Sequence, residues 1–382
     1  VRLLSSADSA EEALWLWMKI LFLSPLSSTA QKFFNNINYK TQNWKLMKRQ
    51  FLIIAVLIVT ITSACKKTDS DSGTTLKGIL VLNEGNFGQA NASVTSYNPE
   101  SGEVSQNRYE NVNGSPIGDV LYSATEIGDR LYLVVNNSSK IEVVDKETFT
   151  KIATIRIANE ASPRELVKVS ETKAYVTNLF GNSVSVINLE TNEEVSTIAV
   201  GSNPEGIAVV DELAYVANSG FGNGNTISVI NTSSDTVMRT ITVGDNPLSI
   251  KKQDNNLLWV VCAGAYGDFN DPNDDTPGTI YVLNGETGEV VSNFEVGGHP
   301  GDLVLNNKDD IAYLLNGSVM SIDMNTYEVT NSEFINRNFY SLGFSTTDDG
   351  QFIWAADAKN FAQAGVAIQY SLNGAKVDSF AT

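Results

Sequence analysis

A short pattern that recurs along most of the chain limits its fold more than any other feature. Residues 173–200 read KAYVTN, a loop with glycine, NSVSVIN, a polar turn and EVSTIAV. Apolar and polar residues alternate in these runs, as Val184 and Ser185 do, which predicts β-strands with one buried face. Related runs begin at Ala214 and Thr279. A repeat of roughly 40 residues with four short strands predicts the blades of a β-propeller.

Seven such units fill the chain from about residue 77 to its end. The first unit begins with ILVLN at Ile79 and lacks a run for an inner strand, whereas the six later units each have one. We therefore expect an all-β protein, a seven-bladed β-propeller of four-stranded antiparallel blades whose blade 1 lacks its inner strand. Because the last run ends at Thr382, the strand that would close the ring onto blade 1 is missing, and we expect either an open closure or a truncated C-terminus.

The residues before the repeats differ in character. Residues 1–46 carry no repeat phrase, and we interpret them as a spurious or disordered N-terminal extension, with a genuine helix as the alternative. Residues 47–64 have the basic start and short apolar run of a lipoprotein signal peptide. The signal would end before Cys65, which we expect to be lipidated. Residues 65–76 then form a polar tether to the propeller of residues 77–382.

Charge and composition exclude several classes of function. The net charge of −18 would repel phosphate polyanions, so we expect no nucleic-acid partner. There are two cysteines, and lipidation of Cys65 would leave Cys262 without a disulfide partner. His299 is the only histidine, and no nucleophile, zinc or phosphate-binding motif accompanies it. We predict no enzymatic activity and no cofactor.

Two columns of residues predict a functional face. Five of the nine prolines precede an inner strand, namely Pro116, Pro163, Pro204, Pro247 and Pro300. A second column ends the second strand of each blade and comprises Asn83, Asn136, Asn178, Asn218, Cys262, Asn316 and Asp357. Loops at these two positions emerge on the same side of a propeller, so both columns should surround one mouth of the central channel. The alternative for any single asparagine is a local turn-forming role.

Aromatic and amide side chains gather in the same loops. Aromatic faces with neutral hydrogen-bonding groups suit a large, flat, uncharged ligand that carries amides, although some of these rings could simply pack the loops against blade edges. The predicted ligand-binding residues are Asn83, Asn86, Phe87, Asn136, Asn178, Phe180, Asn218, Phe221, Tyr266, Phe269, Arg164, Arg337, Tyr340, Asp357 and Phe361.

One long loop, residues 263–278, is rich in acidic residues. Asp268, Asp271, Asp274 and Asp275 are weak candidates for Ca²⁺ ligands, because carboxylate oxygens suit that ion. The loop lacks the full calcium-loop pattern, with no glutamate at its twelfth position. A solvated acidic loop is the alternative, and we predict no metal.

The phrases AYVTN and SVSVIN resemble the YVTN (YncE-like) family of seven-bladed propellers. VLNEGNFG at 81–88 and DAKNFAQAGVAIQYSLNG at 357–374 resemble a branch found on surface lipoproteins of Bacteroidetes. Some members of that branch capture cobalamin beside an outer-membrane transporter. The resemblance therefore implies a lipid-anchored outer-membrane protein, exposed at the cell surface, that binds a corrinoid for a TonB-dependent transporter.

Two other functions stay open at this point. Propellers often serve as scaffolds for protein–protein interaction, and a surface scaffold is the first alternative. Some YVTN relatives resemble lactonases, so a lactonase-like hydrolase is the second. The number of blades cannot separate these functions.

Overall fold

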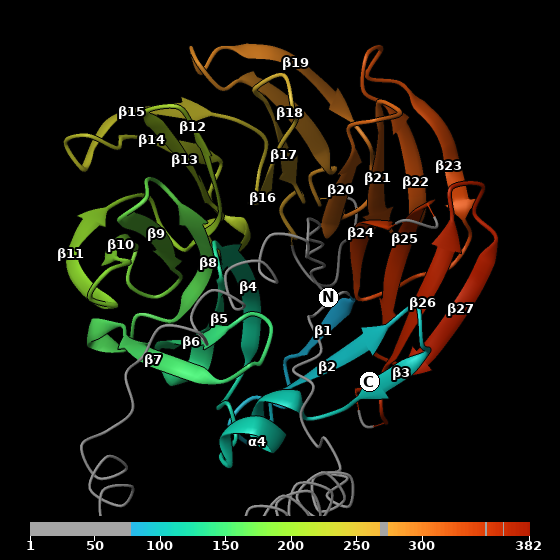
Figure 1. Cartoon of the computed structure of the whole chain (residues 1–382). Helices are drawn as coiled ribbons and strands as arrows, with labels where there is room; N and C mark the ends of the chain where they lie inside the picture. The colour runs from blue at the N-terminus through green and yellow to red at the C-terminus, as the bar shows by residue number, and fades with distance from the viewer. Residues whose placement is uncertain (1–77, 268–273, 348–349, 362) are drawn as a thin grey trace, which may run out of the picture. The chain divides into compact units, whose positions relative to one another are not determined.

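The computed structural model describes residues 78–267, 274–347, 350–361 and 363–382. These residues form seven antiparallel sheets arranged as a ring, one sheet per blade, which confirms the predicted seven-bladed propeller (Figure 1). The predicted segments 1–46, 47–64 and 65–76, and Cys65 with them, lie outside the described residues. None of the described helices has the length and hydropathy needed to cross a bilayer.

Each blade is a meander of consecutive strands. Blade 1 has β1 (Ile79–Asn83), β2 (Ser93–Asn98) and β3 (Glu103–Ser105). Blades 2 to 4 comprise β4 (Leu121–Ile127), β5 (Arg130–Val135), β6 (Lys140–Asp145), β7 (Lys151–Arg156), β8 (Pro163–Lys168), β9 (Lys173–Asn178), β10 (Ser183–Asn188), β11 (Glu193–Ala199), β12 (Pro204–Val210), β13 (Leu213–Asn218), β14 (Thr226–Asn231) and β15 (Thr236–Thr242). Blades 5 to 7 comprise β16 (Pro247–Lys252), β17 (Leu257–Cys262), β18 (Thr279–Asn284), β19 (Val290–Glu295), β20 (Asp302–Asn306), β21 (Ile311–Asn316), β22 (Ser318–Asp323), β23 (Val329–Ile335), β24 (Ser341–Thr347), β25 (Gly350–Asp357), β26 (Val366–Ser371) and β27 (Lys376–Ala381). The first strand of each four-stranded blade lies nearest the axis, and the last lies at the periphery.

The hydrophobic core lies between blades rather than within them. In β9 and β10 both faces are buried, because each middle strand packs against the blade before it and the blade after it. Outer strands are largely exposed, as β15 is, because they lie at the periphery of the ring. Seven clusters of buried residues join the seven pairs of neighbouring blades. Burial between blades therefore fixes the ring.

The ring closes by packing of blade 7 against blade 1. Among the described strands, β27 pairs with β26 alone, and no strand is shared between the two blades. Tyr97 of β2 stacks on Phe380 of β27 with ring centroids 4.5 Å apart, and its hydroxyl donates to Asp378 Oδ2 at 2.7 Å. Trp354 and Val81 complete this seam. The expected three-stranded blade 1 is confirmed, with β1 as the innermost strand of its sheet.

Two local details differ from the sequence prediction. In the run GEVSQNRYEN, whose place at the end of the first unit predicts an outer strand, β3 ends at Ser105 and residues 108–113 form helix α4 (Arg108–Asn113). Tyr109 of this helix is buried against blade 2, so packing decides the local conformation. The column prolines Pro163, Pro204 and Pro247 are the first residues of inner strands rather than loop residues. A first strand position suits proline, which lacks a ladder N–H.

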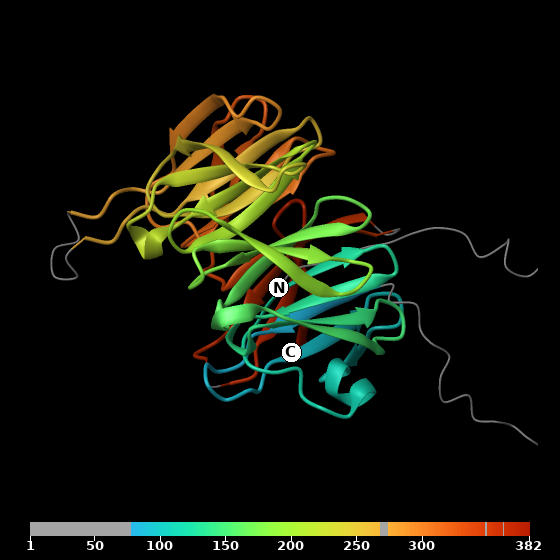
Figure 2. The same ribbon diagram turned by 90° about the vertical axis from the view of Figure 1, so that its left-hand side faces the viewer.

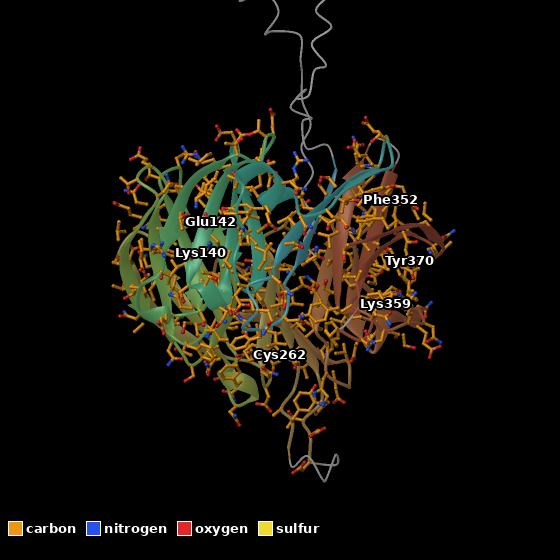
Figure 3. All side chains as sticks on the ribbon, turned by 90° about the horizontal axis from the view of Figure 1, so that it is seen from below. Lys140, Glu142, Cys262, Phe352, Lys359 and Tyr370 are labelled. Atoms are coloured by element: carbon orange, nitrogen blue, oxygen red, sulfur yellow. The ribbon has the colours of Figure 1, made fainter. Side chains whose placement is uncertain are left out.

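Blade 2 also contains a buried carboxylate outside the channel. Glu142 of β6 receives hydrogen bonds from Lys140 Nζ at 2.6 Å and Thr154 Oγ1 at 2.7 Å, and its side chain is 2% exposed (Figure 3). Lys151 Nζ lies 3.0 Å from its second oxygen. Burial alone would raise the pKa of Glu142, but these three donors outweigh burial and lower it. This cluster ties β6 to β7.

Candidate functional site

The loops after the second strand of each blade and the loops before the first strand lie on one side of the ring. Figure 2 shows this side at its left, where the loop from β17 to β18 and the loop from β1 to β2 project. We call this side the mouth. Contacts between distant loops support the assignment, since the Tyr340 hydroxyl of blade 7 donates to Glu84 Oε2 of blade 1 at 2.9 Å.

Six exposed aromatic rings surround the mouth. They come from blades 1, 3, 4, 5 and 7, and each is about half exposed or more: Phe87 73%, Phe180 58%, Phe221 58%, Tyr266 69%, Tyr340 48% and Phe361 69%. Two pairs are in contact, Phe180 with Phe221 at 5.7 Å between centroids and Tyr340 with Phe361 at 5.9 Å. The other exposed large apolar side chains among the described residues are aliphatic and lie on outer strands or on α4. Aromatic exposure is therefore concentrated where loops converge.

Two of these rings are held by a backbone conformation that is unfavourable for bulky residues. Phe221 has φ 52° and Phe361 has φ 60°, both in the left-handed region. Such positions usually take glycine, and a non-glycine residue there costs about 1–2 kcal/mol. Strained residues of this kind cluster at functional sites. The buried Phe149 has a similar φ, so the strain points to a role for Phe221 and Phe361 only in combination with their exposure.

The asparagine column has a clear structural role inside the blades. The Nδ2 of Asn218 donates to Thr226 Oγ1 at 3.1 Å and Ser228 Oγ at 3.0 Å on the next strand. Asn83 and Asn178 make the same paired contacts with the first and third residues of the strand that follows each of them. Asn178 and Asn218 are buried, and their Oδ1 atoms have no partner among the described residues. These side chains connect the second strand to the third, and direct ligand contact by them stays a prediction.

Other members of the column follow different patterns. Asn136 Nδ2 donates to the carbonyl of Pro163, and Asn316 Nδ2 donates to the carbonyls of Val296 and Gly297. In blade 5 the column residue is Cys262, which cannot donate in the same way. Its strand partner Thr279 keeps a buried Oγ1 without a hydrogen bond. Burial raises the pKa of the Cys262 thiol to about 12, so it is inert.

A buried ion pair lies where three inner strands begin. Arg164 Nε and Nη2 donate to the two carboxylate oxygens of Glu205 at 2.7 and 2.9 Å. The guanidinium lies 3.9 Å from the ring centroid of Tyr122, whose hydroxyl also donates to Glu205. Burial alone would lower the pKa of Arg164, but Tyr122 and Glu205 outweigh it and raise that pKa. Arg164 is therefore a fixed cation at the base of the mouth.

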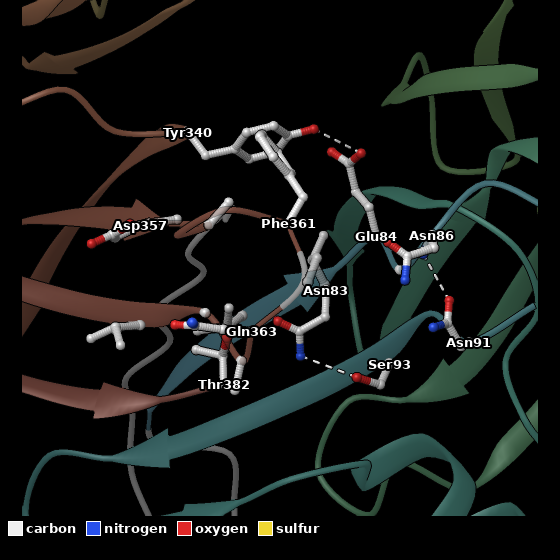
Figure 4. A pocket seen from close by; sticks show the side chains of 18 residues that line it. Asn83, Glu84, Asn86, Asn91, Ser93, Tyr340, Asp357, Phe361, Gln363 and Thr382 are labelled. Carbon is white, nitrogen blue, oxygen red and sulfur yellow. Dashed lines mark hydrogen bonds between the residues drawn. The ribbon is translucent and has the colours of Figure 1, made fainter. Parts of the chain in front are cut away.

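A cavity of about 380 Å³ lies at the seam between blades 7 and 1 (Figure 4). We call it the seam cavity. Five of the predicted residues line it, and they are Asn83, Asn86, Tyr340, Asp357 and Phe361. The carboxylate of Asp357 pairs with Arg337 and with Lys359 Nζ. Burial, followed by the nearby charge of Glu84, raises the pKa of Tyr340 and keeps its hydroxyl a donor.

A second cavity of about 240 Å³ lies at blades 4 and 5, lined by Phe221, Tyr266 and Glu205 among others. Tyr266 stacks on His299 with centroids 3.9 Å apart, and His299 Nδ1 is 2.8 Å from the carbonyl of Ala263. His299 Nε2 is 3.4 Å from Asp275 Oδ2. This histidine supports the platform formed by Tyr266.

The structure brings most predicted residues together at the mouth, but in separate groups. Asn83, Asn86, Asp357, Phe361 and Tyr340 meet at the seam cavity, and Phe221 and Tyr266 at the second cavity. Phe269, Asp268 and Asp271 lie outside the described residues. Asp275 accepts a hydrogen bond from the N–H of Gly267, and the described residues include no cluster of three or more potential metal ligands.

Sequence analysis missed Glu84, Tyr122, Glu205 and Gln363. One signal could have found Glu205, because Arg164 and Glu205 each follow a proline of the column directly. Residues in equivalent positions of neighbouring blades lie side by side around the axis, so opposite charges there predict an ion pair.

Comparison with known proteins agrees with this architecture. Residues 77–265 match a family described as a domain of unknown function, DUF5074. The chain contains a DUF5074 domain. The match covers blades 1 to 4 and the first two strands of blade 5, so the DUF5074 region holds the asparagine column from Asn83 to Asn218 and the Arg164–Glu205 pair.

Solved structures show the fold alone. A candidate 6-phosphogluconolactonase from Bacteroides fragilis is 13% identical with a TM-score of 0.59, over 82% of this chain and 95% of that one. A similar protein from Bacteroides uniformis is 12% identical with a TM-score of 0.59, over 79% and 96% of the two chains. No curated protein matches the sequence. The chain thus has the fold of these lactonase-like propellers, and at such identities the likeness carries no function.

Proposed function

We propose that the protein captures a corrinoid such as cobalamin on the mouth of the propeller. The observation that carries this proposal is the ring of exposed aromatic side chains, two of them in strained conformations, on the one side where two cavities also open. Stacking on these rings supplies apolar contact, and the amides between them supply hydrogen bonds. A ligand with a broad ring and peripheral amides matches both features.

The proposal includes the location and the partner that the sequence predicts. The protein would be anchored in the outer membrane through lipid on Cys65, exposed at the cell surface, and would deliver its ligand to a TonB-dependent transporter. We expect Cys65→Ala to move the protein from the membrane fraction to the soluble fraction, because one anchor is lost. Retention of the variant in membranes would contradict anchoring through this residue.

Titration of the purified protein with cyanocobalamin, followed by absorbance, tests the binding itself. We expect saturable binding at micromolar concentration or tighter, with little dependence on salt, since screening acts weakly on a neutral ligand. Phe87→Ala should weaken binding by about 1–2 kcal/mol. Absence of binding to any corrinoid at these concentrations would remove the proposal.

A surface scaffold for proteins is the second candidate. It is favoured by exposed aliphatic side chains on the outer strands, such as Met238 at 60% and Val291 at 49%. These side chains lie at the periphery, away from the mouth, so a protein partner there would not compete with a ligand.

A further inference from the structure

The two loops that flank the seam cavity carry nearly the same sequence. Residues 86–90 between β1 and β2 read NFGQA, and residues 360–364 between β25 and β26 read NFAQA. These loops belong to blades 1 and 7, which meet at the seam, and the cavity of about 380 Å³ lies between them. The chain therefore carries one short sequence twice, on neighbouring blades, and Asn86 of the first copy and Phe361 and Gln363 of the second line one hollow.

Hydrogen bonds fix the first loop and the chain that leads into the second loop. The Asn86 N–H donates to Asn91 Oδ1 at 2.8 Å, and the Gly88 N–H donates to Asp119 Oδ2 at 2.8 Å. On the other side, the Lys359 N–H donates to Asp357 Oδ1 at 2.8 Å. A preorganised loop loses little conformational entropy on binding, so its free polar groups can act with full effect.

Several polar groups of the cavity have no partner among the described residues. The side-chain amides of Asn86 and Gln363 make no hydrogen bond there, and Asn91 uses its Oδ1 but leaves its Nδ2 free. An amide offers two N–H donors and one carbonyl acceptor. A ligand group that both donates and accepts hydrogen bonds would pair best with these side-chain amides. A primary carboxamide has its N–H donors and its carbonyl acceptor in one plane.

The charges of the cavity favour a neutral group. Among its described lining residues the charged side chains are Glu84 and Asp357. Asp357 is paired with Arg337 and Lys359, whereas Glu84 accepts a hydrogen bond from the neutral hydroxyl of Tyr340. A ligand carboxylate bound here would be repelled by the Glu84 carboxylate. The corresponding ligand amide is neutral and avoids this repulsion. An ammonium group would suit Glu84 but would leave the free amide N–H groups without acceptors.

We propose that the seam cavity selects a primary carboxamide of the ligand over the corresponding carboxylate. Gln363 and Asn86 would bind the amide, and Glu84 would reject the acid and accept an amide N–H. The location of the ligand rests on the proposed function, whereas the choice of amide over acid rests on the lining of this cavity.

The test compares cyanocobalamin with its monocarboxylic acids, in which one side-chain amide is hydrolysed, by equilibrium titration. We expect at least one isomer to bind about 10-fold more weakly than cyanocobalamin. Glu84→Gln should reduce that difference, because it removes the repulsion. Gln363→Ala should weaken cyanocobalamin binding about 5-fold and leave binding of that acid nearly unchanged.

The chain offers a matched control. Gln89 occupies the same position in the first loop as Gln363 does in the second, but it is outside the described lining of the cavity. Gln89→Ala should therefore bind like the wild type. Equal affinity for cyanocobalamin and every monoacid, or equal losses in Gln89→Ala and Gln363→Ala, would overturn the inference and leave the proposed function standing.

A fragment experiment separates failure of the inference from failure of the proposed function. If no corrinoid binds, the proposed function falls, and ligand-observed NMR with glutaramide and glutarate decides the inference alone. A saturable glutaramide signal that exceeds the glutarate signal and disappears in Gln363→Ala would support it. No signal, or signals of equal size for the two fragments, would overturn it.

Discussion

At the scale of single residues, the asparagine column is the clearest link between sequence and structure. Asn218 ends β13, and its amide spans two hydroxyls of β14. Gly201 makes this possible, because a Cβ at that position would lie 2.5 Å from the Asn218 side chain. In blade 5, Gly244 holds the corresponding position beside Cys262 and Thr279.

This comparison predicts that Cys262→Asn stabilises the protein. The new amide would give the buried Thr279 hydroxyl its missing hydrogen bond, and Gly244 leaves the space that Gly201 leaves in blade 4. We expect a gain of about 0.5–1.5 kcal/mol in the free energy of unfolding, measured by chemical denaturation. The control is Cys262→Ala, which removes the thiol without adding a donor. A Cys262→Asn protein no more stable than the control would contradict the interpretation.

At the strained aromatic residues, we expect a change to glycine to maintain or raise stability and to lower ligand affinity. Phe221→Gly removes the side chain from a backbone with φ 52°, so the variant should be at least as stable as wild type while its corrinoid affinity falls about 10-fold. Phe221→Ala keeps the strain and loses the ring, so it should be less stable than Phe221→Gly by about 1 kcal/mol. Thermal unfolding and titration of both variants check this. A Phe221→Gly protein with unchanged affinity would exclude this ring from the site.

At the scale of strands and loops, regular features could be predicted and contacts between blades could not. Alternation of apolar and polar residues in runs such as SVSVIN predicts a strand without knowledge of its neighbours in space. The ends of these predicted strands then located the loops that carry the aromatic residues. The helix α4 was missed because its formation depends on the burial of Tyr109 against blade 2. The Arg164–Glu205 pair was missed because its partners are 41 residues apart and meet only after the ring forms.

The buried carboxylate between β6 and β7 predicts a pH dependence of stability. The pKa of Glu142 is lower in the folded protein than in the unfolded chain, so its contribution is present above the unfolded value. That contribution is lost as the pH falls from about 4.3 through the lower folded pKa. Glu142→Gln should lose about 1–3 kcal/mol near pH 7 and show a smaller loss on acidification than wild type. Equal acid sensitivity of both proteins in urea unfolding would contradict this role.

At the scale of the whole molecule, the seam differs from the other six boundaries, because the described chain passes from one blade to the next at those boundaries but not between blades 7 and 1. Blade 1 and blade 7 share no described strand, and Tyr97, Trp354 and Phe380 carry their contact. We expect β1 and β27 to exchange their amide hydrogens faster than the equivalent strands at the boundary of blades 3 and 4. Phe380→Ala should cost about 3–5 kcal/mol and accelerate this exchange. Uniform exchange around the ring would show that the seam is no weaker than other boundaries.

The mouth gathers loops that are far apart in sequence, and we expect a single ligand to contact both of its sides. Phe221 lines the cavity at blades 4 and 5, and Phe361 lines the seam cavity. The most direct test is a cyanocobalamin titration of Phe221→Ala, Phe361→Ala and the double variant, with stoichiometry measured by calorimetry. We predict one ligand per chain, a loss of about 1–2 kcal/mol in each single variant and a nearly additive loss in the double variant. Two ligands per chain, or a loss of affinity from only one of the two rings, would show that no single ligand contacts both sides of the mouth.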